Sequence, residues 1–408
     1  MQTGLAAPAR LPLDQIAGVV EQELASTPFV DVHTHLFMPS LGRLGLWGID
    51  ELITYHYLEA ELFRSSRIAP DDYFRLSKQQ QADAIWRALF VDNSPVSEAA
   101  RGVVAVLESF GLDTGAGDLR EARAFFGEQD LEAHLRRTLE LAGVSDVVMT
   151  NDPLDPDEAP LWEKGAEADV RFHPALRLDR ILNDGVLAGR PASEVRRFLD
   201  AWCMRMQPVY MAVSLPDSFV YPEDNQRGRL LTDAVLPACR DFHIPLSLMI
   251  GVRRRVNPAL RLAGDALGRA DLRALERLCV EFPENRFLVS VLSRENQHEL
   301  CVYAGKFGNL MPFGCWWFLN NPSMVEEITR ERIEMLGMSF IPQHSDARVL
   351  EQLVYKWRNT RRTLAPVLTN SYRLLAEDGG GVTRAHIHRD IARLFRGNFE
   401  VFCAREAC

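Results

Sequence analysis

The sequence has few of the features that mark secreted, membrane or repeat proteins. Its seven cysteines are scattered, with no C-x-x-C pair and no even framework, which favours a reduced, cytoplasmic protein over a disulfide scaffold. No apolar run approaches about 18 residues, so no transmembrane helix is expected. Residues 1–11 lack the basic start and the apolar run of a signal peptide. Internal repeats, low-complexity tracts and long charge runs are also missing.

The charge balance narrows the class of partner. A net charge of -10 argues against nucleic acid and against an anionic membrane surface. It leaves room for a small anionic substrate, because a site can be locally positive. The 408 residues, 47% hydrophobic and 25% charged, are enough to form a large core. We also expect the chain to form a homo-oligomer.

The first strong apolar stretch, residues 29–36, ends in two histidines spaced two residues apart, His33 and His35. Side chains two apart on a strand point to the same face, and Asp31 shares that face. Two neighbouring neutral imidazoles suit a divalent metal such as Zn²⁺, Mn²⁺ or Fe²⁺, with zinc expected first. The alternative is a pair of ordinary histidines on a half-exposed strand.

Apolar runs typical of buried strands recur along the rest of the chain, with helical patterns between most of them. Alternating β and α patterns predict a parallel sheet, and eight units favour a (β/α)₈ TIM-type barrel. Residues 37–140 contain helical patterns only and are interpreted as an insertion or lid after the first strand. The barrel domain then comprises residues 1–36 and 141–408, with extra C-terminal helices at about 347–377 and 383–397. The later strands are expected at 145–150, 169–176, 209–215, 244–250, 286–292, 309–314 and 339–343.

Catalytic side chains of such barrels gather at the carboxyl ends of the strands. The eighth strand, which adjoins the first when the barrel closes, is followed by Asp346. Asp346 can therefore complete a site with His33 and His35 that keeps open positions for water or substrate. The alternative role for Asp346 is the N-cap of the following helix. His173, with Arg177, is placed at the end of the third strand, whereas His134 is expected at the surface.

Four further side chains follow strand ends. Arg177 and Arg348 are candidates to bind a carboxylate bidentately, with a solvated or structural arginine as the alternative. Trp316 and Trp317 are candidates for one wall of a sugar site, or for core. The three arginines 253–255 are expected to be solvated or interfacial.

The insertion carries one candidate pair of its own. His56 and Tyr57 lie on a predicted helix that could fold over the barrel mouth and supply acid–base groups. A packed aromatic cluster is the alternative for this pair.

Several segments, in order along most of the chain, resemble uronate isomerase (glucuronate isomerase), a divergent branch of the amidohydrolase superfamily. The similar segments are Val32-His-Thr-His-Leu36, Tyr55-His-Tyr57 with Phe63-Arg64, Val148-Met-Thr-Asn-Asp-Pro-Leu154, His173-Pro-Ala-Leu-Arg177 with Asp179, Phe313-Gly-Cys-Trp-Trp-Phe318, Ser345-Asp-Ala-Arg348 and Ala392-Arg-Leu-Phe-Arg-Gly397. No single match is decisive, but their order and spacing together are specific.

The chain also departs from the family pattern. Ser214-Leu-Pro-Asp-Ser218 stands where the family has S-D-H-G, and Met249 stands where its L-H-I-G has histidine. Arg254-Arg-Val-Asn257 replaces an N-N-N-T run, and Tyr55 replaces an aspartate. The metal and lid segments therefore match the pattern, whereas the far wall of the pocket differs.

The resemblance implies an aldose–ketose isomerisation of a hexuronate, such as D-glucuronate to D-fructuronate, by proton transfer from C2 to C1. It implies one divalent metal on His33, His35 and Asp346, and substrate contacts from the two arginines. Either Asp346 or Tyr57 would act as the base, with His56 assisting. The competing hypothesis is a metal-dependent hydrolase or decarboxylase that acts on another sugar-acid-like carboxylate. A third hypothesis is a sugar-acid binding protein without catalytic activity.

Overall fold

The protein, analysed as a computed structural model, is described over residues 10–404. Most of the segment 1–11, whose sequence lacks a signal peptide pattern, lies outside these residues, as does Cys408. Among the helices of residues 10–404, none is long and apolar enough to cross a membrane.

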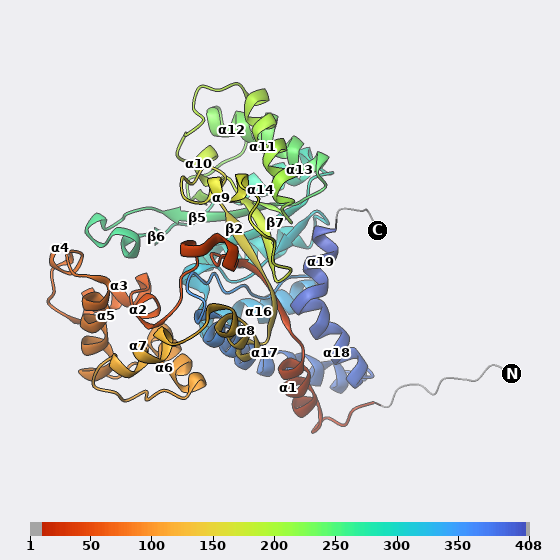
Figure 1. The fold of residues 1–408 in the computed structure, drawn as a ribbon. Helices are drawn as coiled ribbons and strands as arrows, with labels where there is room; N and C mark the ends of the chain where they lie inside the picture. The colour runs from red at the N-terminus through yellow and green to blue at the C-terminus, as the bar shows by residue number, and fades with distance from the viewer. Residues whose placement is uncertain (1–9, 405–408) are drawn as a thin grey trace.

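A curled parallel sheet forms the centre of the molecule (Figure 1). The strands pair with their sequence neighbours, so each helical connection returns the chain to the next position of the sheet. The predicted barrel class is confirmed, and each expected strand from the first to the seventh overlaps an observed one. The strands are β1 Phe29–Thr34, β2 Val144–Asn151, β3 Phe172–Arg177, β4 Met211–Pro216, β5 Leu246–Arg253, β7 Phe287–Val291 and β8 Leu310–Pro312.

The eighth barrel position is less regular than predicted. Ile341 forms only an isolated parallel bridge beyond β8. The chain then reaches β1, where the Asp346 N–H donates to the His33 carbonyl (3.2 Å) and the His35 N–H donates to the Ala347 carbonyl (2.7 Å). These two hydrogen bonds close the barrel and bring residues 346–347 beside the end of β1. A short strand that the sequence did not predict, β6 (Ala266–Leu267), pairs antiparallel with β5.

The segment between β1 and β2 folds as a helical insertion with a core of its own, at the lower left of Figure 1. Its helices are shorter than the sequence predicts, because the helical patterns at about 50–64, 70–89 and 118–141 are each divided into two helices. Val349, Val354 and Tyr355, which follow the last barrel strand, pack into this core. The insertion helices are α2 Ile49–Ile53, α3 His56–Ser65, α4 Pro70–Tyr73, α5 Lys78–Trp86, α6 Glu98–Phe110, α7 Arg120–Gly127 and α8 Leu131–Ala142.

Local sequence signals explain where the insertion returns to the sheet. The Asp130 carboxylate accepts a hydrogen bond from the Ala133 N–H and so caps the start of α8. Gly143 ends the helix in the left-handed conformation (φ 65°), which a side chain would make unfavourable. Val144 then begins β2 directly.

The remaining helices surround the sheet, and the last of them form the C-terminal part of the chain (Figure 1). The longest, α17, follows the last barrel strand and packs against α1, α16 and the insertion helices α6 and α8. They are α1 Ile16–Ser26, α9 Ala159–Glu163, α10 Asp179–Leu182, α11 Ala192–Met206, α12 Gln226–Leu230, α13 Leu236–Asp241, α14 Arg273–Glu281, α15 Gln297–Ala304, α16 Pro322–Leu336, α17 Gln352–Glu377, α18 Arg384–Ala392 and α19 Asn398–Cys403.

A buried polar pair joins the insertion to the chain that follows the last strand. His134 Nε2 lies 2.7 Å from Glu351 Oε1, and both side chains are fully buried. The same carboxylate oxygen accepts a hydrogen bond from the Gly48 N–H (2.9 Å). The expectation that His134 is a surface residue was therefore wrong, because α8 turns that face toward the junction rather than toward solvent.

We expect Glu351→Ala to lower the free energy of unfolding by about 3 kcal/mol, because it leaves a buried histidine and a buried N–H without their acceptor. Denaturant unfolding measures the change. The matched control is Glu377→Ala, which removes an exposed carboxylate on α17. Equal stability of the two variants would show that the pair does not support the fold.

Candidate functional site

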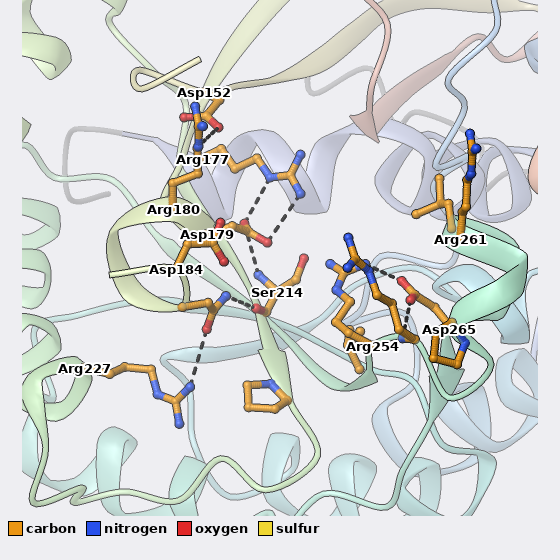
Figure 2. A pocket seen from close by; sticks show the side chains of 16 residues that line it. Asp152, Arg177, Asp179, Arg180, Asp184, Ser214, Arg227, Arg254, Arg261 and Asp265 are labelled. Carbon is orange, nitrogen blue, oxygen red and sulfur yellow. Dashed lines mark hydrogen bonds and ion pairs between the residues drawn. The ribbon is translucent and has the colours of Figure 1, made fainter. Parts of the chain in front are cut away.

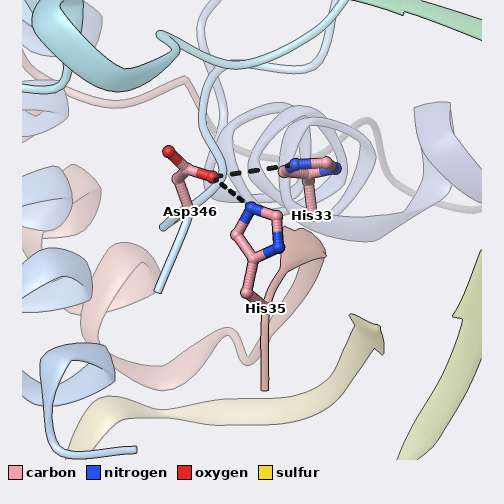
Figure 3. A group of neighbouring side chains, drawn as sticks. All are labelled: His33, His35 and Asp346. Carbon is pink, nitrogen blue, oxygen red and sulfur yellow. Dashed lines mark ion pairs between the residues drawn. The ribbon is translucent and has the colours of Figure 1, made fainter. Parts of the chain in front are cut away.

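Three side chains converge where β1 ends (Figure 3). The Asp346 Oδ1 atom lies 3.7 Å from His33 Nε2 and 3.3 Å from His35 Nε2. All three candidate ligand atoms lie within 4.8 Å of one another. In residues 10–404 this is the one such group of histidine, cysteine and carboxylate side chains. The arrangement predicted from the sequence is therefore formed.

The hydrogen bonds of His33 determine which ring nitrogen carries its proton. The Tyr210 hydroxyl donates to the Val32 carbonyl (2.8 Å), so its oxygen is free to accept from His33 Nδ1 (3.1 Å). A proton on Nδ1 leaves a lone pair on Nε2, the atom that faces Asp346.

The hydrogen bonds of His35 place its ring proton in the same way. The Thr150 hydroxyl donates to the Thr34 carbonyl (3.0 Å) and accepts from His35 Nδ1 (2.7 Å). The Nε2 lone pair of His35 therefore also points toward Asp346. Two imidazole lone pairs and a carboxylate oxygen then face one another with no proton between them.

The electrostatics of this cluster suit a cation. Burial lowers the pKa of His33 to about 3 and that of His35 well below its usual value, so both rings are neutral. The Asp346 Oδ1 atom is buried and accepts no hydrogen bond from residues 10–404. An anionic oxygen in that position is costly unless a cation neutralises it. Two neutral nitrogens and one oxygen fit a divalent metal with open coordination positions.

The backbone around Asp346 also excludes its alternative role. Asp346 has a left-handed φ of 53°, and α17 begins only at Gln352. The carboxylate is therefore not the N-cap of a helix. Strained backbone of this kind collects at functional sites, where the surrounding structure holds it.

Asp31 supports the cluster from behind. Its carboxylate accepts hydrogen bonds from the Ser345 N–H (3.0 Å) and from Trp357 Nε1 (2.8 Å). Burial raises its pKa to about 6, although these donors pull in the other direction. Asp31 therefore holds the loop that carries Asp346, instead of joining the group of ligand atoms as its strand face suggested.

A pocket, here called the inner pocket, opens onto the three ligand residues. Arg177 and Arg348, together with Trp316 and Trp317, line it, so the predicted substrate-binding side chains are brought together. The remaining lining residues are His33, His35, Thr150, Asp179, Ala212, Val213, Ser214, Met249, Arg254 and Asp346. The pocket is small, with a volume of about 30 Å³.

His56 and Tyr57 lie behind Trp317, outside the inner pocket. The His56 ring packs edge-on against Trp317, with ring centroids 5.9 Å apart. Neither residue is among those of residues 10–404 that line the inner pocket. Burial lowers the pKa of His56 well below its usual value, and its Nε2 is buried without a hydrogen-bond partner in the described chain. Their catalytic roles stay predictions.

His173, which was assigned to the end of the third strand, lies elsewhere. His173 follows the first residue of β3, at the opposite end of the barrel, where it pairs with Asp146 (3.3 Å). The strand begins three residues later than predicted, which moves His173 from its end to its start. Arg177, the last residue of the strand, is where the prediction placed it.

Two supporting residues were not predicted as part of the site. Thr150 ends the predicted second strand and is the penultimate residue of β2, so its position was a signal that could have been used. Tyr210 lies just before β4 and reaches His33 across the barrel, which no local pattern reveals. Arg254, expected to be solvated or interfacial, is half exposed, lies over Trp317 (5.8 Å to the ring centroid) and lines the inner pocket.

The fold and the sequence resemble those of solved uronate isomerases. The uronate isomerase of Bacillus halodurans C-125 is 48% identical, over 97% of this chain and 98% of that chain, with a TM-score of 0.94. The chain belongs to the uronate isomerase family. Met249, which stands where the family pattern has a histidine, therefore lies in the pocket of a family member, as does Ser214, the first residue of the other segment that departs from the pattern.

More distant members share the fold. The uronate isomerase of Thermotoga maritima is 16% identical over 96% of this chain and 97% of that chain, with a TM-score of 0.73. The glucuronate isomerase of Caulobacter crescentus is 14% identical over 98% and 95%, with a TM-score of 0.68. No protein-family model matches the sequence, and no curated protein sequence matches it either.

We expect the purified protein to hold about one divalent ion per chain, and His35→Ala to lose it, because a catalytic metal site rarely retains its ion with one of three protein ligands removed. Elemental analysis by mass spectrometry measures the ion. His173→Ala is the matched control, since it removes a histidine at the other end of the barrel. Equal metal content in both variants would exclude the proposed ligands.

We expect Tyr210→Phe to weaken metal binding by about 10- to 100-fold without unfolding the protein, because His33 then loses the acceptor that orients its ring. Competition with a chelator measures the affinity, and circular dichroism checks the fold. An unchanged affinity would mean that the Tyr210 hydroxyl does not orient His33.

Proposed function

We propose that the protein isomerises a hexuronate, such as D-glucuronate, to the corresponding ketose by moving a proton from C2 to C1. The observation that carries the proposal is the meeting of the three ligand residues and the two arginines in one pocket of a uronate isomerase family member. Intramolecular oxidation of C2 and reduction of C1 requires a base near C2 and positive charge near the two oxygens.

Each side chain has a distinct task in this scheme. Arg177 and Arg348 bind the substrate carboxylate or hydroxyls, and the Asp179 carboxylate fixes the Arg177 guanidinium at 3.1 Å. A divalent ion on His33, His35 and Asp346 supplies Lewis acidity toward the substrate oxygens when bound. We take zinc as the first expectation for this ion.

Two residues remain candidates for the base. Asp346 lines the pocket, and its Oδ1 accepts no hydrogen bond from residues 10–404, so this oxygen is open to a proton from the substrate. Tyr57 is buried, and burial raises its pKa well above the usual value, so it suits the role of proton donor better than that of base. His56 is neutral and could orient the open-chain sugar. Asp346 is therefore the better candidate on electrostatic grounds.

The hydrolase or decarboxylase alternative receives less support. Met249 supplies an apolar side chain to the pocket where the family pattern has a histidine. Only one group of metal-binding side chains is found in residues 10–404, so a second ion has no evident ligands there. Cytoplasmic location, participation in glucuronate catabolism and a homo-oligomeric state stay predictions.

We expect the protein to convert at least one hexuronate to its ketose and, in deuterated water, to place deuterium at C1 of the product, because the enediol intermediate takes its second proton from a group that exchanges with solvent. Nuclear magnetic resonance of the product measures both outcomes. A panel of hexuronates left unchanged by metal-loaded protein would overturn the proposal, and turnover of a lactone or amide panel would favour the alternative.

The same measurement separates the two bases. Tyr57→Phe keeps all three ligand residues, so we expect it to retain metal and to place deuterium at C1 of the product as the wild type does. Loss of deuterium incorporation in this variant, with its metal intact, would assign the base to Tyr57 instead of Asp346.

A further inference from the structure

A second, much larger cavity adjoins the inner pocket (Figure 2). This outer cavity has a volume of about 1040 Å³ and shares Arg177, Asp179, Ser214 and Arg254 with the inner pocket. Sites for small molecules usually measure about 300–1,000 Å³. A hexuronate therefore fits in the outer cavity in this conformation, whereas the inner pocket has room for only about 30 Å³.

The wall formed by the chain after β5 is positively charged. Arg254, Arg255 and Arg261 line it together with a single carboxylate, Asp265. Arg254 pairs with that carboxylate at 2.6 Å. Within residues 10–404, the guanidinium groups of Arg255 and Arg261 form no ion pair with a carboxylate. This wall thus offers the unpaired charge of Arg255 to an anion, and beside it that of Arg261, which also acts on the Glu59 carboxyl of the insertion and favours its charged form.

The opposite wall has a different character. Each of its three arginines has a carboxylate partner, since Arg177 pairs with Asp179 (3.1 Å), Arg180 with Asp152 (4.0 Å) and Arg227 with Glu223. It also presents the side chains of Asn183 and Asp184. Carboxylate and amide oxygens accept hydrogen bonds from hydroxyl groups. A molecule with a carboxylate at one end and several hydroxyls matches the two walls together.

The backbone of the positive wall is held in an unfavourable conformation. Arg255 and Arg261 have left-handed φ angles of 50° and 53°. Trp317 and Asp346, which line the inner pocket, have φ angles of 48° and 53°. Such strain persists only where the surrounding structure holds it, and it gathers at ligand sites. One contact that holds Arg261 in place comes from the insertion, where the Phe74 ring centroid lies 4.0 Å from its guanidinium.

We propose that the outer cavity is a separate binding site that captures the sugar acid before it reaches the inner pocket. Arg255 and Arg261 bind its carboxylate, and the opposite wall binds its hydroxyls. Arg254, which lines both pockets, marks the route between them. The identity of the ligand rests on the proposed function, but its chemistry, a small polyhydroxy carboxylate, is recognised by the two walls themselves.

Capture of this kind opposes the repulsion that a protein with a net charge of -10 exerts on an anionic substrate. We expect the double variant Arg255→Gln/Arg261→Gln to keep kcat and to lower kcat/KM about five-fold at low ionic strength. The difference between wild type and variant should vanish at about 0.5 M salt, because screening removes the contribution of exposed charges.

The matched control is Arg362→Gln/Arg373→Gln, which removes two exposed arginines from α17 that line neither pocket. It should show the kcat/KM of the wild type at every salt concentration. Three results would overturn the proposal. The capture-site variant could keep its kcat/KM at low salt, or lose as much kcat as kcat/KM. The control variant could also lose as much kcat/KM as the capture-site variant.

A binding measurement makes the test independent of turnover. D-gluconate is a polyhydroxy carboxylate without an aldehyde, so it cannot be isomerised, and calorimetry can follow its binding. We expect Arg255→Gln/Arg261→Gln to bind it about five-fold more weakly than wild type at low ionic strength. If the protein turns over no hexuronate, only the proposed function is rejected. The capture site is rejected separately, if wild type and Arg255→Gln/Arg261→Gln bind gluconate with equal affinity.

Discussion

The closure of the barrel is the constraint on which the rest of the site depends. Two backbone hydrogen bonds, between His33 and Asp346 and between His35 and Ala347, join segments more than 300 residues apart in the chain. Because they pair the ends of the first and last barrel positions, they place the carboxylate opposite both imidazoles. Without this register, the histidines would form a chelating pair with no anionic partner.

Several buried polar contacts reinforce the same junction. Asp31 holds the backbone of Ser345, and Tyr210 and Thr150 orient the two imidazoles. Further along, Glu351 ties the chain after the last strand to His134 and Gly48 of the insertion. Each of these groups would be costly to bury alone, so the network favours one arrangement of the metal-binding loop. The insertion is thereby joined to the barrel close to the loop that carries Asp346.

The two cavities differ in size and in the contacts that they offer a ligand. The inner pocket is narrow and combines metal ligands, arginines and indole rings, which suits selective contact with the reacting end of a sugar. The outer cavity is wide, and a positively charged wall faces one whose arginines are paired with carboxylates. Exposed charges of this sort contribute more to the rate of encounter than to the strength of the final complex. An acidic protein can in this way act on an acidic substrate.

Periodicity and motif order were enough to predict much of this molecule. Alternating apolar runs indicated the barrel, and the spacing of His33 and His35 indicated a chelating pair, since both depend on local geometry with a fixed period. Residues directly after strands, such as Arg177 and Arg348, were found because the carboxyl ends of parallel strands meet at one face. Boundary errors of a few residues had consequences where the end of a strand mattered, and His173 was misplaced for that reason.

What the sequence by itself determined is therefore the fold class, the family and the candidate group of metal ligands, all of which depend on short-range patterns and on strand order. Only the tertiary structure decided which polar groups are buried together and where charge is left unpaired. Tyr210 reaches His33 across the barrel, His134 is buried against Glu351, and Arg255 and Arg261 face a cavity. Contacts of this kind depend on side-chain directions and on packing between distant segments, for which a single sequence has no periodic signal.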